Sequence, residues 1–174
     1  MSGLTNEAII MDLSDTLFTE FYEEPKLING DLIWAKSGNG RYDIKDVDVI
    51  SNVFSENDVK LYCRYNIFND FAFTVVCYGK EKNIIIRYDK KIHPLSYREP
   101  CEGLKVVEPH KHLFKTGCPN GRVKIIPDSE IDSKNVNDAL FHFFDECNIV
   151  LDGGYEKLKP MYQTKVYAYG DGDT

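Results

Sequence analysis

Residues 59–89 narrow the folds open to this chain more than any other segment. Apolar side chains occupy every second position of residues 59–67, which is the spacing of a strand with one buried face. Residues 71–78 are continuously apolar, and residues 83–89 contain three consecutive isoleucines. The links between these runs are short, whereas parallel strands need long crossovers. The segment therefore predicts three consecutive antiparallel strands.

Two further segments carry the apolar spacing of a helix. Residues 6–22 place apolar side chains at every fourth position, and Pro25 follows as a terminator. Residues 134–148 place large apolar side chains, among them Phe143 and Phe144, on one side of a helix. We expect each helix to bury its apolar side against the sheet, because an amphipathic stripe needs a partner surface.

The remaining pattern completes the predicted sheet. Residues 32–35, 104–114 and 122–126 read as strands, and residues 116–121 as a hairpin loop. Residues 42–50 fit either a strand or a loop with a helical turn. The predicted fold is α+β, with an antiparallel sheet of about five to seven strands packed against an N-terminal and a C-terminal helix.

A chain of 174 residues fits one domain. We predict a single α+β domain over residues 1–152. Residues 153–174 are predicted to form a C-terminal extension, with an edge strand over residues 164–169 and a frayed acidic end.

The cysteine pattern and the hydropathy favour a cytoplasmic protein. The five cysteines are odd in number and include no Cys-x-x-Cys motif. The first residues do not form a signal peptide, and the longest uncharged apolar run, residues 71–78, is too short to span a bilayer. We therefore predict reduced thiols, a cytoplasmic location and no membrane contact.

Charge is distributed unevenly along the chain. Residues 80–124 contain eleven Lys or Arg and five acidic residues, a net charge of +6 in a chain whose total is −7. Such a segment can form an anion-binding surface, for nucleic acid among other ligands. Alternatively, these side chains face solvent and pair with acidic neighbours in space. The candidate binding residues are Arg87, Lys90, Lys91, Arg98, Lys111 and Lys115.

The histidines are the main candidates for chemistry. In a strand, His110 and His112 project to the same face, where two imidazoles could act as an acid–base pair, bind phosphate or simply pack. His93 lies in a predicted basic loop and completes the candidate catalytic set. A weaker alternative is a zinc site formed by Cys101, His110, His112 and Cys118, although the spacing matches no compact zinc finger.

Complete catalytic or cofactor motifs are absent from the sequence. There is no phosphate-binding loop, no dinucleotide fingerprint, no His-Glu-x-x-His and no nucleophile elbow. We therefore predict no cofactor, and the sequence leaves open whether the protein is an enzyme.

The segment Glu108 to Phe114, the strand over residues 122–127 and the closing helix ending Phe143-Phe144-Asp145-Glu146-Cys147-Asn148-Ile149 resemble an uncharacterised bacterial and phage domain family. The family pattern is a Pro-His-x-His strand, a glycine-containing turn and a helix that ends in Phe…Cys-Asn-Ile. The resemblance covers residues 59–149. It implies a mobile-element context and singles out His110 and His112 for testing, but it implies no activity.

Two functional hypotheses follow. The first is a small intracellular interaction protein of a phage or mobile element that binds a macromolecule, as an anti-defence (anti-CRISPR-like) inhibitor or a toxin–antitoxin component. Its partner would be a protein, including one of a nucleic-acid-binding complex. The alternative is a metal-independent ribonuclease-type toxin that uses His93, His110 and His112. A domain whose histidines only pack remains a third alternative.

Overall fold

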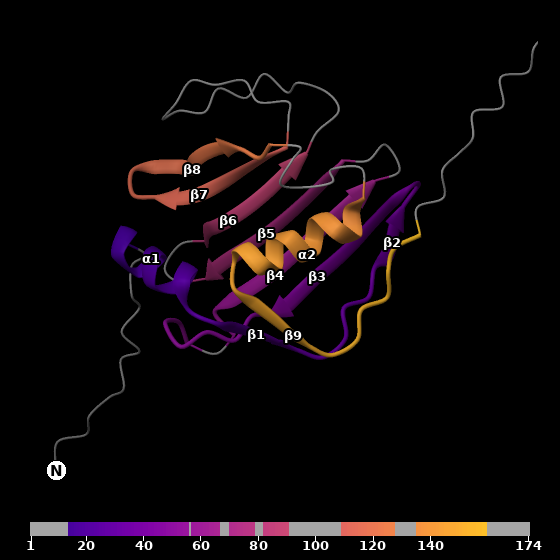
Figure 1. Ribbon diagram of the computed structural model, residues 1–174, viewed down its shortest axis with the longest axis horizontal. Helices are drawn as coiled ribbons and strands as arrows, with labels where there is room; N and C mark the ends of the chain where they lie inside the picture. Colours follow the sequence, from indigo (N-terminus) through magenta and orange to yellow (C-terminus); the bar gives the residue numbers. More distant parts are fainter. Residues whose placement is uncertain are drawn as a thin grey trace, which may run out of the picture.

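The computed structural model describes residues 14–55, 57–66, 70–78, 82–90, 109–127 and 135–159 (Figure 1). Its main element is a seven-stranded sheet in which every pair of neighbours is antiparallel. In spatial order the strands are β2 (Ala35–Gly38), β3 (Arg41–Asp48), β4 (Val59–Asn66), β5 (Phe71–Tyr78), β6 (Lys82–Lys90), β7 (His110–Lys115) and β8 (Cys118–Ile125). Spatial order equals chain order, as expected when short links join consecutive strands.

Two helices and a small parallel sheet complete the described fold. Helix α1 (Asp15–Glu23) lies beside the β7 end of the large sheet, and α2 (Val136–Glu146) crosses one of its faces (Figure 1). Strand β1 (Lys26–Asn29) pairs in parallel with β9 (Ile149–Asp152). The predicted α+β class, with an antiparallel sheet and a helix towards each end of the chain, is confirmed.

The core lies between α2 and the sheet. The ring of Phe143 contacts Phe73 of β5 at 5.8 Å and Tyr88 of β6 at 4.9 Å between centroids. Leu140 and Phe144 are also buried. Because burial of each such side chain stabilises the fold by roughly 1.5–3 kcal/mol, α2 fixes which face of the sheet is internal. We call the face in contact with α2 the helix face.

Helix α1 has a clear cap at each end. The Ser14 side chain accepts a hydrogen bond from the Leu17 amide at 3.2 Å and begins the helix. At the other end the buried Lys26 ammonium donates to the carbonyls of Phe21 and Glu24, at 2.5 and 2.8 Å. Burial lowers the pKa of Lys26 to about 8, although the electrostatic interactions with Cys147 and Glu24 act in the opposite direction and raise it. The described helix is the second half of the predicted helix 6–22, whose first residues lie outside the described part.

Several predicted strand boundaries differ from the structure. Residues 42–50, which the sequence left open, lie mainly in β3, where a bulge between Ile44 and Val47 interrupts the alternation and Asp46 takes a φ of 55°. The predicted strand 32–35 is instead a single bridge at Leu32 followed by β2 from Ala35. The predicted loop 116–121 is shorter, since β8 already begins at Cys118.

Residues beyond the predicted domain boundary pack onto the domain. Leu158 is buried, and its amide donates to the Asn137 side chain of α2 at 2.9 Å. At the end of β9, a side chain on Gly153 would collide with the Gly30 carbonyl oxygen, at 2.1 Å. The predicted edge strand 164–169 lies outside the described residues. Neither described helix has the length and apolar composition of a membrane span.

Candidate functional site

The polar groups of interest lie on the face of the large sheet that points away from α2, which we call the distal face. Strand register forms one row of side chains across this face from β3 to β7. The row consists of Asp43, Arg64, Ala72, Asp89 and His110, each directly opposite the next. Because side chains alternate between faces, all five belong to one surface.

A second row runs beside the first. It consists of Tyr62, Thr74, Arg87, His112 and Val123, again as directly opposed neighbours. Within both rows the central strand β5 contributes only small side chains, Ala72 and Thr74. Larger charged and aromatic side chains therefore lie on either side of the small side chains of β5.

The first polar group, here called the histidine cluster, consists of Arg87, Asp89, His110 and His112. Asp89 Oδ2 lies 3.5 Å from His112 Nε2 and 3.9 Å from His110 Nε2. The two imidazole rings meet edge to face, with 4.9 Å between centroids. Arg87 contacts both carboxylate oxygens, with Nη2 donating to Oδ1 at 2.9 Å and Nε 2.6 Å from Oδ2.

The carboxylate and the two imidazoles of the histidine cluster are almost fully removed from solvent. Asp89 is 2% exposed, and His110 and His112 are 6% and 7% exposed. Burial alone would raise the pKa of Asp89, but the His112 hydrogen bond and the Arg87 charge outweigh it and lower the pKa. Asp89 is therefore an ionised carboxylate held between a guanidinium and two imidazoles.

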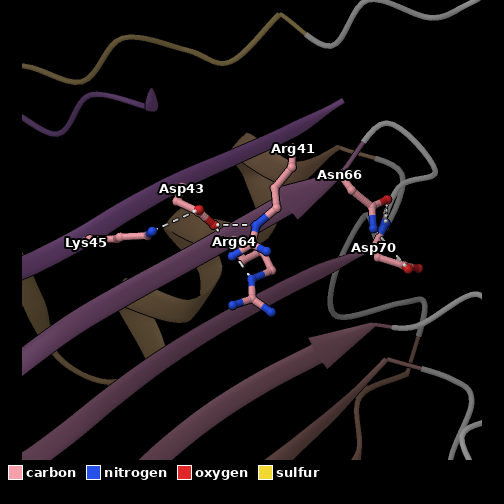
Figure 2. Close-up of polar contacts among 6 residues, drawn as sticks. All are labelled: Arg41, Asp43, Lys45, Arg64, Asn66 and Asp70. Carbon is pink, nitrogen blue, oxygen red and sulfur yellow. Dashed lines mark hydrogen bonds and ion pairs between the residues drawn. The ribbon is translucent and has the colours of Figure 1, made fainter. Parts of the chain in front are cut away.

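The second polar group, here called the Asp43 cluster, lies at the β3 side of the same face (Figure 2). Arg41 Nε lies 3.3 Å from Asp43 Oδ1, Arg64 Nε 3.6 Å from the same oxygen, and Lys45 Nζ 3.5 Å from Oδ2. Asp43 is buried, whereas the side chains of its three cationic neighbours are 40–60% exposed. Figure 2 also shows the hydrogen bond between Asn66, the last residue of β4, and Asp70, which directly precedes β5.

Asp43 keeps unused capacity to accept hydrogen bonds. Its Oδ2 is buried and has no hydrogen-bond partner, although Lys45 lies nearby. Burial opposes ionisation, but the Ser37 and Arg41 hydrogen bonds and the charges of Arg41 and Lys45 lower the pKa of Asp43. A buried ionised oxygen without a donor is costly in a folded protein, so this position favours a bound donor group.

A hollow separates the two clusters. It has a volume of about 280 Å³, and its lining includes Asp43, Lys45, Arg64, Tyr62 and Arg87. The floor is formed by Ala72, Thr74, Val76 and Ile84. The hollow follows from the strand register, because the small Ala72 and Thr74 side chains of β5 lie between larger side chains of β4 and β6.

One signal in the sequence links both clusters. The tripeptide Arg-Tyr-Asp occurs at residues 41–43 and again at residues 87–89. In each copy the Arg and Asp share the distal face, two residues apart, and form an ion pair. Asp43 and Asp89 are not among the site residues predicted from the sequence. The repeated tripeptide inside predicted strands could have indicated both.

The structure separates some of the predicted binding residues. Lys111 is buried on the helix face, where its ammonium contacts Glu146 of α2, while Arg87 lies on the distal face. Lys115 is exposed at the end of β7, and Lys90 is half-buried at the end of β6. Arg87 and Lys111 therefore do not belong to one surface.

Other predicted residues lie outside the described part of the chain, namely His93, Lys91, Arg98 and Cys101. The ribonuclease hypothesis depends on His93 and stays a prediction. Cys118 is disulfide-bonded, so its sulfur is not a thiolate ligand in this structure. The expectation of reduced thiols is therefore wrong for Cys118. Because disulfides persist mainly in oxidising compartments, this bond does not support the predicted cytoplasmic location, which stays a prediction.

Comparison of the chain with protein-family models, curated proteins and solved structures found no match in any of the three. The resemblance to a Pro-His-x-His family and the mobile-element context therefore stay expectations from the sequence.

Proposed function

We propose that the protein binds single-stranded RNA across the distal face of its large sheet. The observation that supports this most is the hollow between the two clusters, which is lined by the cationic side chains of Lys45, Arg64 and Arg87 and by Asp43, whose Oδ2 has no hydrogen-bond partner. Cations from opposite walls of one hollow suit an anionic ligand that lies between them.

The lining offers the kinds of contact that a nucleotide needs. Arg64 and Lys45 suit phosphate oxygens, because charged hydrogen bonds to phosphate are strong. Tyr62 provides an aromatic ring at the edge of the hollow, and unpaired bases stack on such rings. Asp43 Oδ2 can accept from an exocyclic amino group of a base.

Binding of a macromolecule was also expected from the sequence; here the ligand is proposed to be single-stranded RNA and the binding surface to be the distal face. The whole chain carries a net charge of −7, so a general attraction to nucleic acid is not expected. Binding should instead depend on the few cations around the hollow. The phage or mobile-element role is a separate expectation, tested by recovery of a protein partner from nuclease-treated lysate.

The direct test is fluorescence anisotropy with labelled single-stranded RNA of about 12 nucleotides in about 50 mM salt. The variant Arg64→Ala removes one exposed cation from the hollow. We expect its Kd to rise about tenfold. The slope of log Kd against the logarithm of the salt concentration should fall by about one. Arg122→Ala is the matched control, since Arg122 is an exposed strand arginine outside the hollow.

Three results would contradict the proposal. The first is no RNA binding by the wild-type protein, and the second is an equal loss of affinity in Arg64→Ala and Arg122→Ala. The third is equal or tighter binding of single-stranded DNA or of an acidic peptide of similar charge, which would show that the hollow selects charge rather than RNA.

A further inference from the structure

We propose that Asp89, His110 and His112 form a binding site for one divalent transition-metal ion, with Zn²⁺ as the best fit. Each residue offers one ligand atom, and the three atoms lie within 4.8 Å of one another. The inference rests on this cluster alone and is independent of RNA binding.

The separations between the ligand atoms are close to those of a metal site. Zinc bonds of about 2.1 Å at tetrahedral angles place neighbouring ligand atoms about 3.4 Å apart. Asp89 Oδ2 is 3.5 Å from His112 Nε2 and 3.9 Å from His110 Nε2. Small side-chain rotations therefore suffice to bring the three atoms onto one ion.

Strand pairing between β6 and β7 positions the three ligand residues. Asp89 and His110 are directly opposite each other on β6 and β7, and His112 is opposite Arg87 one row away. The side chains of all three ligand residues are buried, each less than 10% exposed. Since the ligands are ordered by strand pairing before any ion arrives, little conformational entropy is lost on binding.

Arg87 has a defined place in the bound site. Its Nη2 donates to Asp89 Oδ1, which leaves Oδ2 as the oxygen that faces both histidines. The ion takes the place of the Arg87 Nε contact at Oδ2, and the Nη2 bond remains to orient the carboxylate. Ligating carboxylates are commonly held by such an outer hydrogen bond.

The donor set restricts the ion. Two imidazoles and one carboxylate suit zinc and its transition-metal neighbours, whereas Mg²⁺ and Ca²⁺ prefer oxygen ligands only. Three protein ligands are one fewer than a closed structural zinc site has, and they leave a coordination position for water or another ligand.

The test is titration of chelator-treated, full-length protein with Zn²⁺, followed by calorimetry, and with Co²⁺, followed by visible absorption. We expect one ion per chain with a Kd below about 10 µM, and a rise in Tm on binding. Absence of Zn²⁺ binding at about 100 µM would overturn the proposal.

Variants locate the site. His110→Gln and His112→Gln each remove one ligand, and we expect either to raise the Kd more than about 100-fold, beyond the loss caused by an outer-shell change. His142→Gln is the matched control, because His142 lies on α2 and contacts Tyr88 on the helix face. Arg87→Ala keeps all three ligands and is expected to retain one bound ion.

A measurement on the wild-type protein covers the case in which a variant fails to fold. In the ¹⁵N spectrum of histidine-labelled protein, Zn²⁺ should shift the imidazole signals of His110 and His112 and leave those of His142 in place. Shifts at His142, or Zn²⁺ binding that survives in both ligand variants, would place the ion elsewhere and overturn the proposal.

Discussion

The two Arg-Tyr-Asp segments of the chain adopt the same local structure in different surroundings. Residues 41–43 and 87–89 both place a buried aspartate and its arginine on the distal face. The partners of Asp43 are exposed cations, with side chains at least 40% accessible. The two histidine partners of Asp89 are buried, with side chains below 10% exposed, and Arg87 is half-buried at 27%.

This comparison separates what a strand sequence determines from what its neighbours determine. Alternation within the tripeptide decides that Arg and Asp share a face. The strand paired alongside decides the chemistry, since β4 offers Arg64 to Asp43 and β7 offers His110 to Asp89. The same tripeptide therefore forms an ion cluster with exposed cations at Asp43 and a group of buried potential metal ligands at Asp89.

The largest expected difference between the segments is in stability. Asp89→Ala leaves Arg87 and two buried imidazoles without their carboxylate, and we expect a loss of about 3 kcal/mol. Asp43→Ala should cost about 1 kcal/mol or less, because exposed cations are re-solvated. Urea denaturation in the presence of a chelator measures both values. Equal losses would show that burial of the partners does not distinguish the clusters.

The next effect concerns the hollow between the clusters. Ala72→Leu places a large side chain between Arg64 and Asp89, which are its direct neighbours across the strands. We expect RNA affinity to fall more than tenfold, or about 1.4 kcal/mol, with little loss of stability, because strands tolerate larger apolar side chains.

Ala35→Leu is the control for this change, since Ala35 is an exposed strand alanine that does not line the hollow. Anisotropy of labelled RNA provides the readout. Undiminished binding by Ala72→Leu would remove the hollow from the binding surface.

A smaller effect concerns the pH dependence of the Asp43 cluster. The pKa of Asp43 is lowered below its ordinary value of 3.8, so its ionised form stabilises the folded state above that pH. We expect the wild-type advantage over Asp43→Asn to shrink as the pH falls below about 4, by less than about 1 kcal/mol in total. Denaturation of both proteins across the acid range checks this, and a growing advantage at low pH would contradict it.

The smallest effect is expected at Lys111, between the two histidines in sequence but on the opposite face. Its partner Glu146 also accepts a hydrogen bond from Tyr22 at 2.9 Å, and burial raises the pKa of Glu146. We expect Lys111→Met to leave RNA affinity unchanged, because Lys111 faces α2 and does not line the hollow. A loss of RNA affinity equal to that of Arg64→Ala would contradict the separation of faces.

Sequence patterns anticipated the features that depend on local periodicity. Alternation in β4 and the apolar side of α2 predicted the sheet and the helix that covers it, and the same alternation placed His110 and His112 together. It also implied that Lys111 faces the other way, although the sequence analysis grouped Lys111 with Arg87 by charge alone. Charge along a chain carries no information about the face of a strand.

What the sequence could not provide is pairing between distant strands. The contact of Asp89 with His110 depends on the register of β6 against β7, which links segments about twenty residues apart. The parallel pairing of β1 with β9 depends on residues at opposite ends of the described chain. The hydrophobic periodicity of a strand shows which face is buried but does not show which distant strand pairs with it, so these contacts could be found only from the structure.

The pairing of β1 with β9 has a consequence for how the protein folds. Strands β2 to β8 pair in chain order, so most of the large sheet can grow from neighbouring hairpins. Lys26, in contrast, pairs with Ile149, and closing a loop of that length costs about 4 kcal/mol in chain entropy. We expect this ladder to form after the large sheet and α2 have brought its strands together. Substitutions in β1 should then speed unfolding more than they slow folding.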